Sequence, residues 1–460
     1  MPSRSLDAPG RGHWSGRTAF ILAAVGSAVG LGNFWRFPYL AGENGGGAFV
    51  LVYLVCVLLV ATPLVMAELL IGRRGQASAV ASLRRLIDEA GAKGLWVAIG
   101  WFGMLAGFLV LSFYSVIAGW ILLYLPKAAA GLGAVDAGEA GALFEGMLRD
   151  PAAMMTAHAL FMILTVVIVG GGIGGGIERA VRVLMPAFFL LLIFLAIFAL
   201  IIGDAATGLA FLFSPDFSKL SADVFLSALS QAFFSVSLGF AALITYGSYL
   251  RRDVEIPQTS LVVTLTDTLV ALVAGLAIFP IVFAFGLQPT QGPGLIFVTL
   301  PVAFGQMPFG GLIALIFFVL AAIAALTSSI SLLEIIVSWL EEKVRWPRIV
   351  SAGAVGLACF ALGIATVLSF NAWSDVRPLA GTGLLESATL FDLKDFIATK
   401  VCLPIGGLMI AVFVAFILPR PITQDELGLG DGAFALWRLL VAGAAIPATI
   451  GVLLISVGLI

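Results

Sequence analysis

The amino-acid sequence predicts an all-α integral membrane protein. Hydrophobic residues make up 61% of the 460 residues and charged residues only 11%, too few to cover a water-exposed surface. Apolar segments follow one another along the whole chain, and several exceed the roughly 20 residues that cross a bilayer as a helix. Two of these segments are interrupted by glycine and polar residues, which distinguishes them from simple membrane anchors.

Eleven apolar segments are predicted as transmembrane helices. The first five and the next five should form an inverted repeat over residues 17–202 and 221–418, because an odd number of spans reverses the topology of the second unit. Residues 1–16 precede the repeats as a cytoplasmic segment, and residues 419–460 carry the eleventh span. The loops 126–150 and 369–390 are rich in Gly, Asp and Pro and should cap the outer side. The predicted spans are residues 17–38, 44–71, 94–125, 151–170, 178–202, 221–249, 257–286, 309–342, 347–368, 391–418 and 433–458.

The positive charges set the orientation of these spans. With the N-terminus in the cytoplasm, 17 of the 24 Lys and Arg residues fall on the cytoplasmic side, as the positive-inside rule requires. The three cysteines Cys56, Cys359 and Cys402 all lie in apolar segments, so no disulfide framework is expected.

The first apolar segment contains an interruption. Gly26, Gly30 and Gly32 are followed by Asn33 in the middle of the span. Each glycine costs a helix interior about 1 kcal/mol, and backbone groups freed in lipid survive where they line a cavity or bind a ligand. We therefore expect residues 29–33 to be unwound, with carbonyls that bind a cation and a following half-helix whose amides face an anion. The alternative is a continuous helix whose small residues allow tight packing.

A second interruption, Ser235–Ala241, favours the unwound alternative. Its Val-Ser-Leu-Gly-Phe echoes the Val-Gly-Leu-Gly-Asn of residues 29–33, and a matched pair of interrupted spans points to a transporter binding site. Together with Gly-Leu-Gly-Asn-Phe-Trp-Arg-Phe-Pro-Tyr at 30–39 and Asn-Gly-Gly-Gly-Ala-Phe at 44–49, the chain resembles the bacterial neurotransmitter:sodium symporter family, the LeuT-like amino-acid transporters, over residues 11–418.

The resemblance implies the LeuT fold, with helices 1 and 6 broken, in a bacterial inner membrane. The implied function is sodium-coupled import of a neutral, hydrophobic amino acid by alternating access. An osmolyte or sulfonate such as betaine or taurine is the alternative substrate. An ion channel would need a continuous polar pore, and a receptor or scaffold would have little need for ion ligands and gates together.

The resemblance also implies two sodium sites built from neutral or singly charged oxygen ligands. The first would use Ala28, Asn33, Ser235 and Asp267, and the second Gly26, Val29, Ala324, Thr327 and Ser328. Hydroxyls in membrane helices also commonly bond the preceding turn, which is the alternative for the last two residues.

Asp267 predicts independence from chloride. A carboxylate within a span is a functional hypothesis by default, and a fixed charge here can replace the anion that some family members need. Tyr53, Gln231 and Ser235 still match parts of the family's chloride environment.

The substrate carboxylate is expected at the amides of Gly30, Leu31 and Gly32, where a half-helix begins. The resemblance implies that the Tyr114 hydroxyl binds the same carboxylate; simple packing in an apolar helix is the alternative. The substrate-binding positions that match the family are Ala28, Gly30, Leu31, Gly32, Val110, Tyr114, Phe234, Ser235, Ser237, Phe240, Ser328 and Leu332.

Gates should close on either side of this pocket. Arg36 and Asp395 match the outer gate, with Phe234 and Tyr114 as a lid beneath them, and Arg11, Trp14, Tyr249 and Glu342 match the inner gate. Interfacial anchoring is the alternative role for the charged residues.

No enzyme constellation, organic cofactor or nucleic-acid partner is expected, since His13 and His158 have no metal-ligand spacing. The expected partners are a small amino acid and the lipid bilayer, and the pattern predicts no particular oligomeric state.

Overall fold

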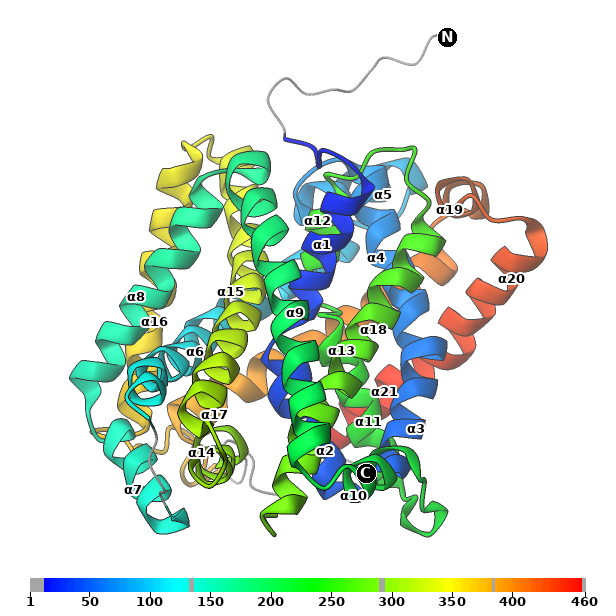
Figure 1. Cartoon of the computed structure of the whole chain (residues 1–460). Coiled ribbons are helices and arrows are strands. Elements are labelled where there is room, and N and C mark those ends of the chain that lie inside the picture. Colours follow the sequence, from blue (N-terminus) through cyan, green and yellow to red (C-terminus); the bar gives the residue numbers. More distant parts are fainter. Residues whose placement is uncertain (1–11, 132–135, 289–293, 383–384, 457–460) are drawn as a thin grey trace.

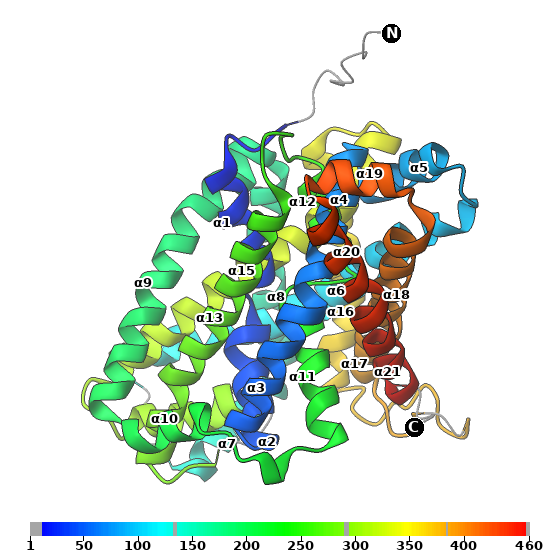
Figure 2. The same ribbon diagram turned by 90° about the vertical axis from the view of Figure 1, so that its right-hand side faces the viewer.

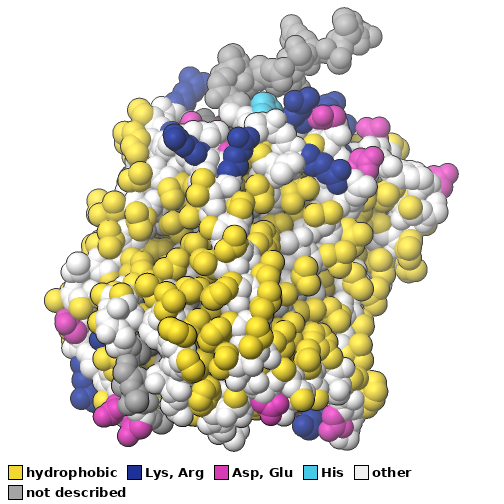
Figure 3. All heavy atoms as spheres, viewed as in Figure 1, with side chains coloured by type: hydrophobic (Ala, Val, Ile, Leu, Met, Phe, Trp, Pro, Cys, Tyr) yellow, Lys and Arg dark blue, Asp and Glu magenta, His cyan; other side chains and the backbone are white. Residues whose placement is uncertain are grey.

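The computed structural model describes residues 12–131, 136–288, 294–382 and 385–456 (Figure 1). Long helices run side by side between two ends of the molecule, and α1 begins at one of these ends. Apolar side chains cover the middle of the visible face, while charged side chains gather at both ends (Figure 3). This distribution matches a bilayer with a hydrocarbon core about 30 Å thick.

Nine helical segments among the described residues are long and apolar enough to cross a membrane, and one pair bent by 51° forms a broken span. The broken span comprises α1 (Arg17–Ala28), η1 (Gly32–Arg36) and α2 (Phe37–Glu43). The other nine are α3 (Gly47–Cys56) with η2 (Val57–Ala61) and α4 (Thr62–Gly75); η3 (Gly94–Val97) with α6 (Ala98–Ala129); α8 (Pro151–Gly170); η4 (Ile173–Glu178) with α9 (Arg179–Ile202); α13 (Ile256–Ala284); α15 (Gly310–Lys343); α16 (Arg348–Ser369); α17 (Leu390–Asp395) with η7 (Phe396–Cys402), α18 (Leu403–Val412) and η8 (Phe413–Ile417); and α20 (Asp431–Leu440) with η9 (Val441–Ala445) and α21 (Ile446–Ser456).

The predicted sixth span consists of two short helices. α11 (Ala222–Ser235) has 14 residues and α12 (Ala242–Gly247) has 6, so neither crosses a bilayer alone. Residues 236–241 separate them. The structure therefore confirms an all-helical membrane fold in which the first and sixth predicted spans are both interrupted.

Several short helices lie between the spans. The loop 126–150, expected to cap the outer side, contains α7 (Ala137–Leu148), which begins with a capping box between Asp136 and Glu139. The other short helices are α5 (Ala79–Ala90), α10 (Ala205–Phe213), η5 (Phe217–Lys219), η6 (Leu295–Thr299), α14 (Leu300–Gly305) and α19 (Arg420–Leu427).

The first broken helix lies at the centre of the molecule. α1 packs against α9, α13 and α15, and α6 packs against α8, α15 and α16. In Figure 1, α8 and α16 lie on one side of α1, while Figure 2 shows α20 and α21 on an outer face. The broken helices are thus surrounded by protein, which allows backbone that is not helical at membrane depth.

Candidate substrate and sodium sites

The first break begins at Val29, whose backbone is extended with φ −70° and ψ 114°. Gly30 follows, and a Cβ there would lie 2.4 Å from the Ser328 hydroxyl oxygen and 3.2 Å from that of Tyr114. Glycine is needed because the backbone approaches both α15 and α6 closely. The break therefore exposes backbone amides and carbonyls to side chains of two other spans.

The second break uses left-handed backbone at three positions, Ser237 (φ 57°), Gly239 (φ 81°) and Ala241 (φ 60°). The Gly239 N–H donates to Oε1 of Glu68 at 2.8 Å, and Glu68 is fully buried on α4. Glu68 thus pairs a backbone amide that the missing helical turn would otherwise have bonded. The sequence interpretation missed this residue, although a carboxylate within the apolar segment 44–71 was a usable signal.

Three of the predicted ligands of the first sodium site form one buried cluster. Asn33 Nδ2 donates to Asp267 Oδ1 at 2.7 Å and to Ser235 Oγ at 3.0 Å, and Ser235 donates to Asp267 Oδ2. Tyr53 donates to Ser235 at 3.3 Å. The cluster joins both broken helices to α13. Its side-chain oxygens are ligands of the hard type that sodium prefers.

The predicted second group lies where α15 faces α1. Ser328 Oγ donates to the Val29 carbonyl at 3.1 Å, which links α15 to the first break. Thr327 instead donates to the carbonyls of Ile323 and Ala324 on its own helix, both at 3.1 Å. A Cβ on Gly26 would lie 3.4 Å from Thr327 Cβ, so the two helices touch here. Thus Ser328 contacts the break, whereas Thr327 shows the local bonding that is common in membrane helices.

A cavity with about 380 Å³ of space not filled by atoms lies between the two breaks. Eleven of the twelve predicted substrate positions line it; the exception is Ser235, which faces the Asn33–Asp267 cluster. Ser27 and Ser331 also line the cavity and were not among the predicted positions. The Leu31 N–H donates to the Tyr114 hydroxyl across a long 3.4 Å bond, so an inserted carboxylate could take a better bond from each group.

An outer cavity of about 340 Å³ adjoins this pocket and shares Leu31, Gly32, Tyr114 and Phe234 with it. Arg36 and Asp395 both line the outer cavity. The hydrogen-bond partners of Arg36 nevertheless lie on α11, since it donates to Gln231 Oε1 at 3.2 Å and to Ser230 Oγ at 3.1 Å. The guanidinium carbon lies 4.8 Å from the centre of the Phe234 ring. Lys400, absent from the predicted gate, lines the same cavity.

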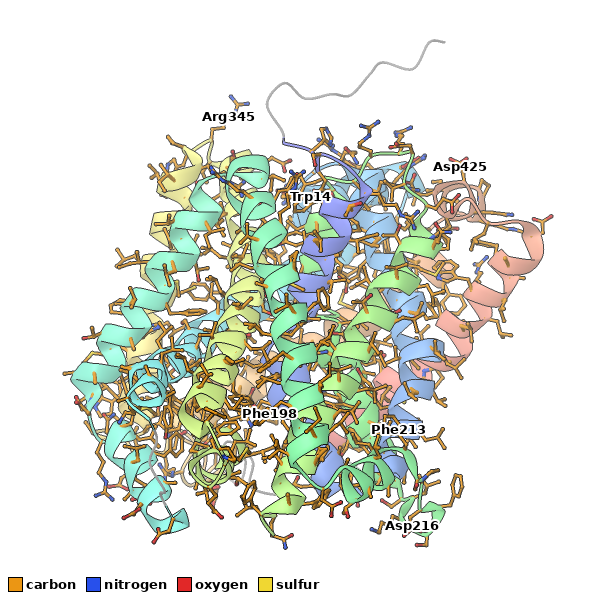
Figure 4. The ribbon with its side chains drawn as sticks, in the orientation of Figure 1. Trp14, Phe198, Phe213, Asp216, Arg345 and Asp425 are labelled. Carbon is orange, nitrogen blue, oxygen red and sulfur yellow. The ribbon has the colours of Figure 1, made fainter. Side chains whose placement is uncertain are left out.

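The inner side is closed around Trp14, whose side chain is buried (Figure 4). Its indole N–H donates to the Tyr246 carbonyl at 3.1 Å, and its ring packs edge-on against Tyr246 and Tyr249. The Tyr249 hydroxyl donates to Glu334 at 2.7 Å. Trp14 and Tyr249, both predicted for the inner gate, therefore lie together.

On the same side of the molecule as Trp14, charged residues connect α15 to α8, to α16 and to the start of α5. Glu334 is fully buried and forms an ion pair with Arg348, which also bonds the Val169 carbonyl at 2.9 Å. Glu342 accepts the Ser78 N–H at 2.7 Å. Arg11 lies outside the described residues. Glu334 and Arg348 were missed because they are 14 residues apart and meet only after α15 and α16 fold back on each other.

A model of the sodium:neurotransmitter symporter family matches residues 11–132 and 144–376. The chain belongs to this family. It is similar to an uncharacterized sodium-dependent transporter, YhdH, of Bacillus subtilis, with 42% identity over 90% of this chain and 89% of the relative. An uncharacterized sodium-dependent transporter of Haemophilus influenzae is 34% identical over 88% of this chain and 89% of the relative.

Among solved structures, the crystal structure of MhsT in complex with L-phenylalanine matches with a TM-score of 0.88 and 46% identity. The match covers 97% of this chain and 99% of that one. The symporter thus has the LeuT fold. It is a sodium-dependent, multi-pass membrane transporter and not an enzyme.

Proposed function

We propose that this symporter imports a neutral, hydrophobic α-amino acid together with sodium by alternating access. The observation that carries this proposal is the cavity between the two breaks. Val110, Phe234, Phe240 and Leu332 give it apolar walls, and Leu31 and Tyr114 offer groups that bind a carboxylate. MhsT, solved with L-phenylalanine, is 46% identical to this chain and supports the same substrate class.

The proposal includes two sodium sites. Asn33, Ser235 and Asp267 would bind one ion beside the substrate, together with the Ala28 carbonyl. Thr327 and Ser328 on α15 would bind the other, together with the carbonyls of Gly26, Val29 and Ala324. Sodium at either site would hold the first break in its bound shape, and ions that share ligands with the substrate must raise its affinity reciprocally. The carboxylate of Asp267 would supply the negative charge, so transport would not need chloride.

The orientation follows from the distribution of charge. Lys and Arg side chains gather at the end of the molecule where α1 begins (Figures 1 and 3), which supports a cytoplasmic N-terminus. Arg36 and Asp395 would then form the outer gate, and Trp14, Tyr249 and Glu342, with Arg11, the inner gate. The localisation proposed is a bacterial inner membrane.

The test is sodium-dependent uptake into liposomes, with all the amino acids, taurine and betaine as competitors of one labelled substrate. Each buried methylene contributes about 0.8 kcal/mol, so affinity should rise from alanine toward valine, leucine, methionine or phenylalanine. Charged amino acids should compete poorly because the side-chain end of the cavity offers no partner for their charges. Competition by taurine or betaine but not by leucine or phenylalanine would refute the amino-acid assignment and leave sodium symport standing.

A further inference from the structure

A groove lies on the surface of the protein between the start of α19 and α20, two helices that follow one another at the edge of the molecule (Figure 1). It holds about 620 Å³ of space not filled by atoms. Two arginines and four apolar residues line it: Arg420, Phe434, Ala435, Arg438, Leu439 and Ala442. The transport cavity uses none of these residues.

The two arginines of the groove differ in their hydrogen-bond partners. Arg420 donates to Asp431 Oδ1 at 2.6 Å and to Gln424 at 3.0 Å, and its guanidinium carbon lies 5.5 Å from the Phe434 ring centre. Arg438 donates to the Ala415 carbonyl at 2.7 Å, which carries no charge. Of these two cations, Arg420 forms an ion pair with Asp431, whose side chain is 85% exposed.

The surroundings of the groove face lipid. The segment Asp431–Ile455 has the smallest buried share of the nine continuous spans, 17% over its most apolar window. Leu436 and Leu439 are 57% and 65% exposed, and Phe416 on the neighbouring span is 61% exposed. Acyl chains can thus lie against α20 directly below the two guanidinium groups.

We propose that this groove is a binding site for one anionic phospholipid, whose phosphate is held by Arg420 and Arg438 and whose acyl chains lie along α20. Basic pockets between spans recognise anionic headgroups by charge, and guanidinium groups form bidentate hydrogen bonds with phosphate oxygens. Bound there, the lipid joins α19 and the end of η8 to the last described span.

The experiment titrates the full-length protein in neutral detergent with phosphatidylglycerol, phosphatidylcholine of the same chain length, or inorganic phosphate, and counts bound molecules by native mass spectrometry. The wild type should bind one phosphatidylglycerol at least about tenfold more tightly than phosphatidylcholine. Arg420→Gln with Arg438→Gln should abolish this preference. Arg251→Gln with Arg252→Gln, two arginines from the loop before α13, should keep it.

A variant that is expected to raise the affinity for phosphatidylglycerol gives a second test. Asp431→Asn removes the carboxylate beside Arg420 and should tighten phosphatidylglycerol binding. If the double variant does not fold, Arg420→Gln alone, which changes an exposed side chain, should still weaken the binding. Equal loss in the Arg251 and Arg252 control would show a diffuse basic surface and overturn the site. Displacement of the lipid by inorganic phosphate at equal concentration would show a site for free phosphate instead.

Discussion

The carboxylate of Asp267 has neutral hydrogen-bond donors on both oxygens. Asn33 bonds one oxygen at 2.7 Å and Ser235 bonds the other. A buried carboxylate is costly unless it is hydrogen-bonded or paired with a cation. Neither donor neutralises it, so its charge remains available to an ion bound by the same three side chains.

Replacing Asp267 should therefore create a need for chloride. Wild-type uptake should be unchanged when gluconate replaces chloride, whereas Asp267→Ser should lose at least about tenfold in gluconate, about 1.4 kcal/mol, and recover part of it in chloride. Asp253→Asn, which removes an exposed carboxylate, is the control. A wild type that already needs chloride would contradict this account.

The two hydroxyls on α15 make a second residue-scale prediction. Thr327→Ala with Ser328→Ala should weaken the sodium dependence of substrate binding by at least tenfold, about 1.4 kcal/mol. The single Ser328→Ala change should account for most of this effect if the observed contact with Val29 reflects the ligand geometry. Ser329→Ala is the matched control, because its hydroxyl bonds Thr165 and Leu326 instead. Unchanged sodium dependence in the double variant would remove the second site.

At the scale of elements, both breaks have backbone groups that are satisfied by side chains of other spans. Ser328 bonds the Val29 carbonyl of the first break, and Glu68 bonds the Gly239 amide of the second. Only one carboxylate oxygen of Glu68 has a hydrogen-bond partner among the described residues. The shape of the second break thus depends on α4.

Glu68→Ala should destabilise the transporter by about 1–3 kcal/mol, because it leaves the buried Gly239 amide without an acceptor. Glu68→Gln keeps an acceptor oxygen and should cost less. Thermal unfolding in detergent compares the two, and uptake should fall in the same order. Equal stability of the alanine variant and the wild type would mean that another group satisfies Gly239.

The spans could be predicted to within a few residues because apolar length is a local property of the sequence. The breaks could also be located, since Gly30, Gly32 and Gly239 mark them. The left-handed backbone of Ser237 and Ala241 could not, because these residue types do not favour it and packing imposes it. Most of the residues that line the substrate cavity were predicted from positions that match the family. The Glu334–Arg348 ion pair could not be predicted, because it depends on how α16 packs back along α15.

At the scale of the whole molecule, the two sides of the transport site are unequal. An outer cavity of about 340 Å³ reaches the Tyr114–Phe234 lid, while Trp14, Tyr249 and Glu334 close the inner side. The proposed alternating access requires this inner contact to break. The Glu334–Arg348 ion pair should therefore stabilise the conformation in which the inner side is closed.

Arg348→Gln should shift the transporter toward inward-open conformations. Without the Arg348 guanidinium, Glu334 is a buried carboxylate with no cation beside it. Breaking a buried ion pair in this way costs about 3–5 kcal/mol in the conformation that keeps Glu334 buried. Glu334 can regain water only if the inner side opens, so the population must move that way.

Accessibility of an introduced cysteine measures this shift. Thr245→Cys places a thiol on α12, where Thr245 is fully buried, and the native cysteines Cys56, Cys359 and Cys402 are buried too. Labelling from the cytoplasmic side should be several-fold faster with Arg348→Gln, and sodium should slow it. Arg345→Gln is the control, because Arg345 lies in the connection just before α16 and projects into solvent (Figure 4). Adding Glu334→Gln to Arg348→Gln should restore slow labelling, since the unpaired charge is then gone. If the double variant labels as fast as Arg348→Gln alone, the charge of Glu334 is not what opens the inner side.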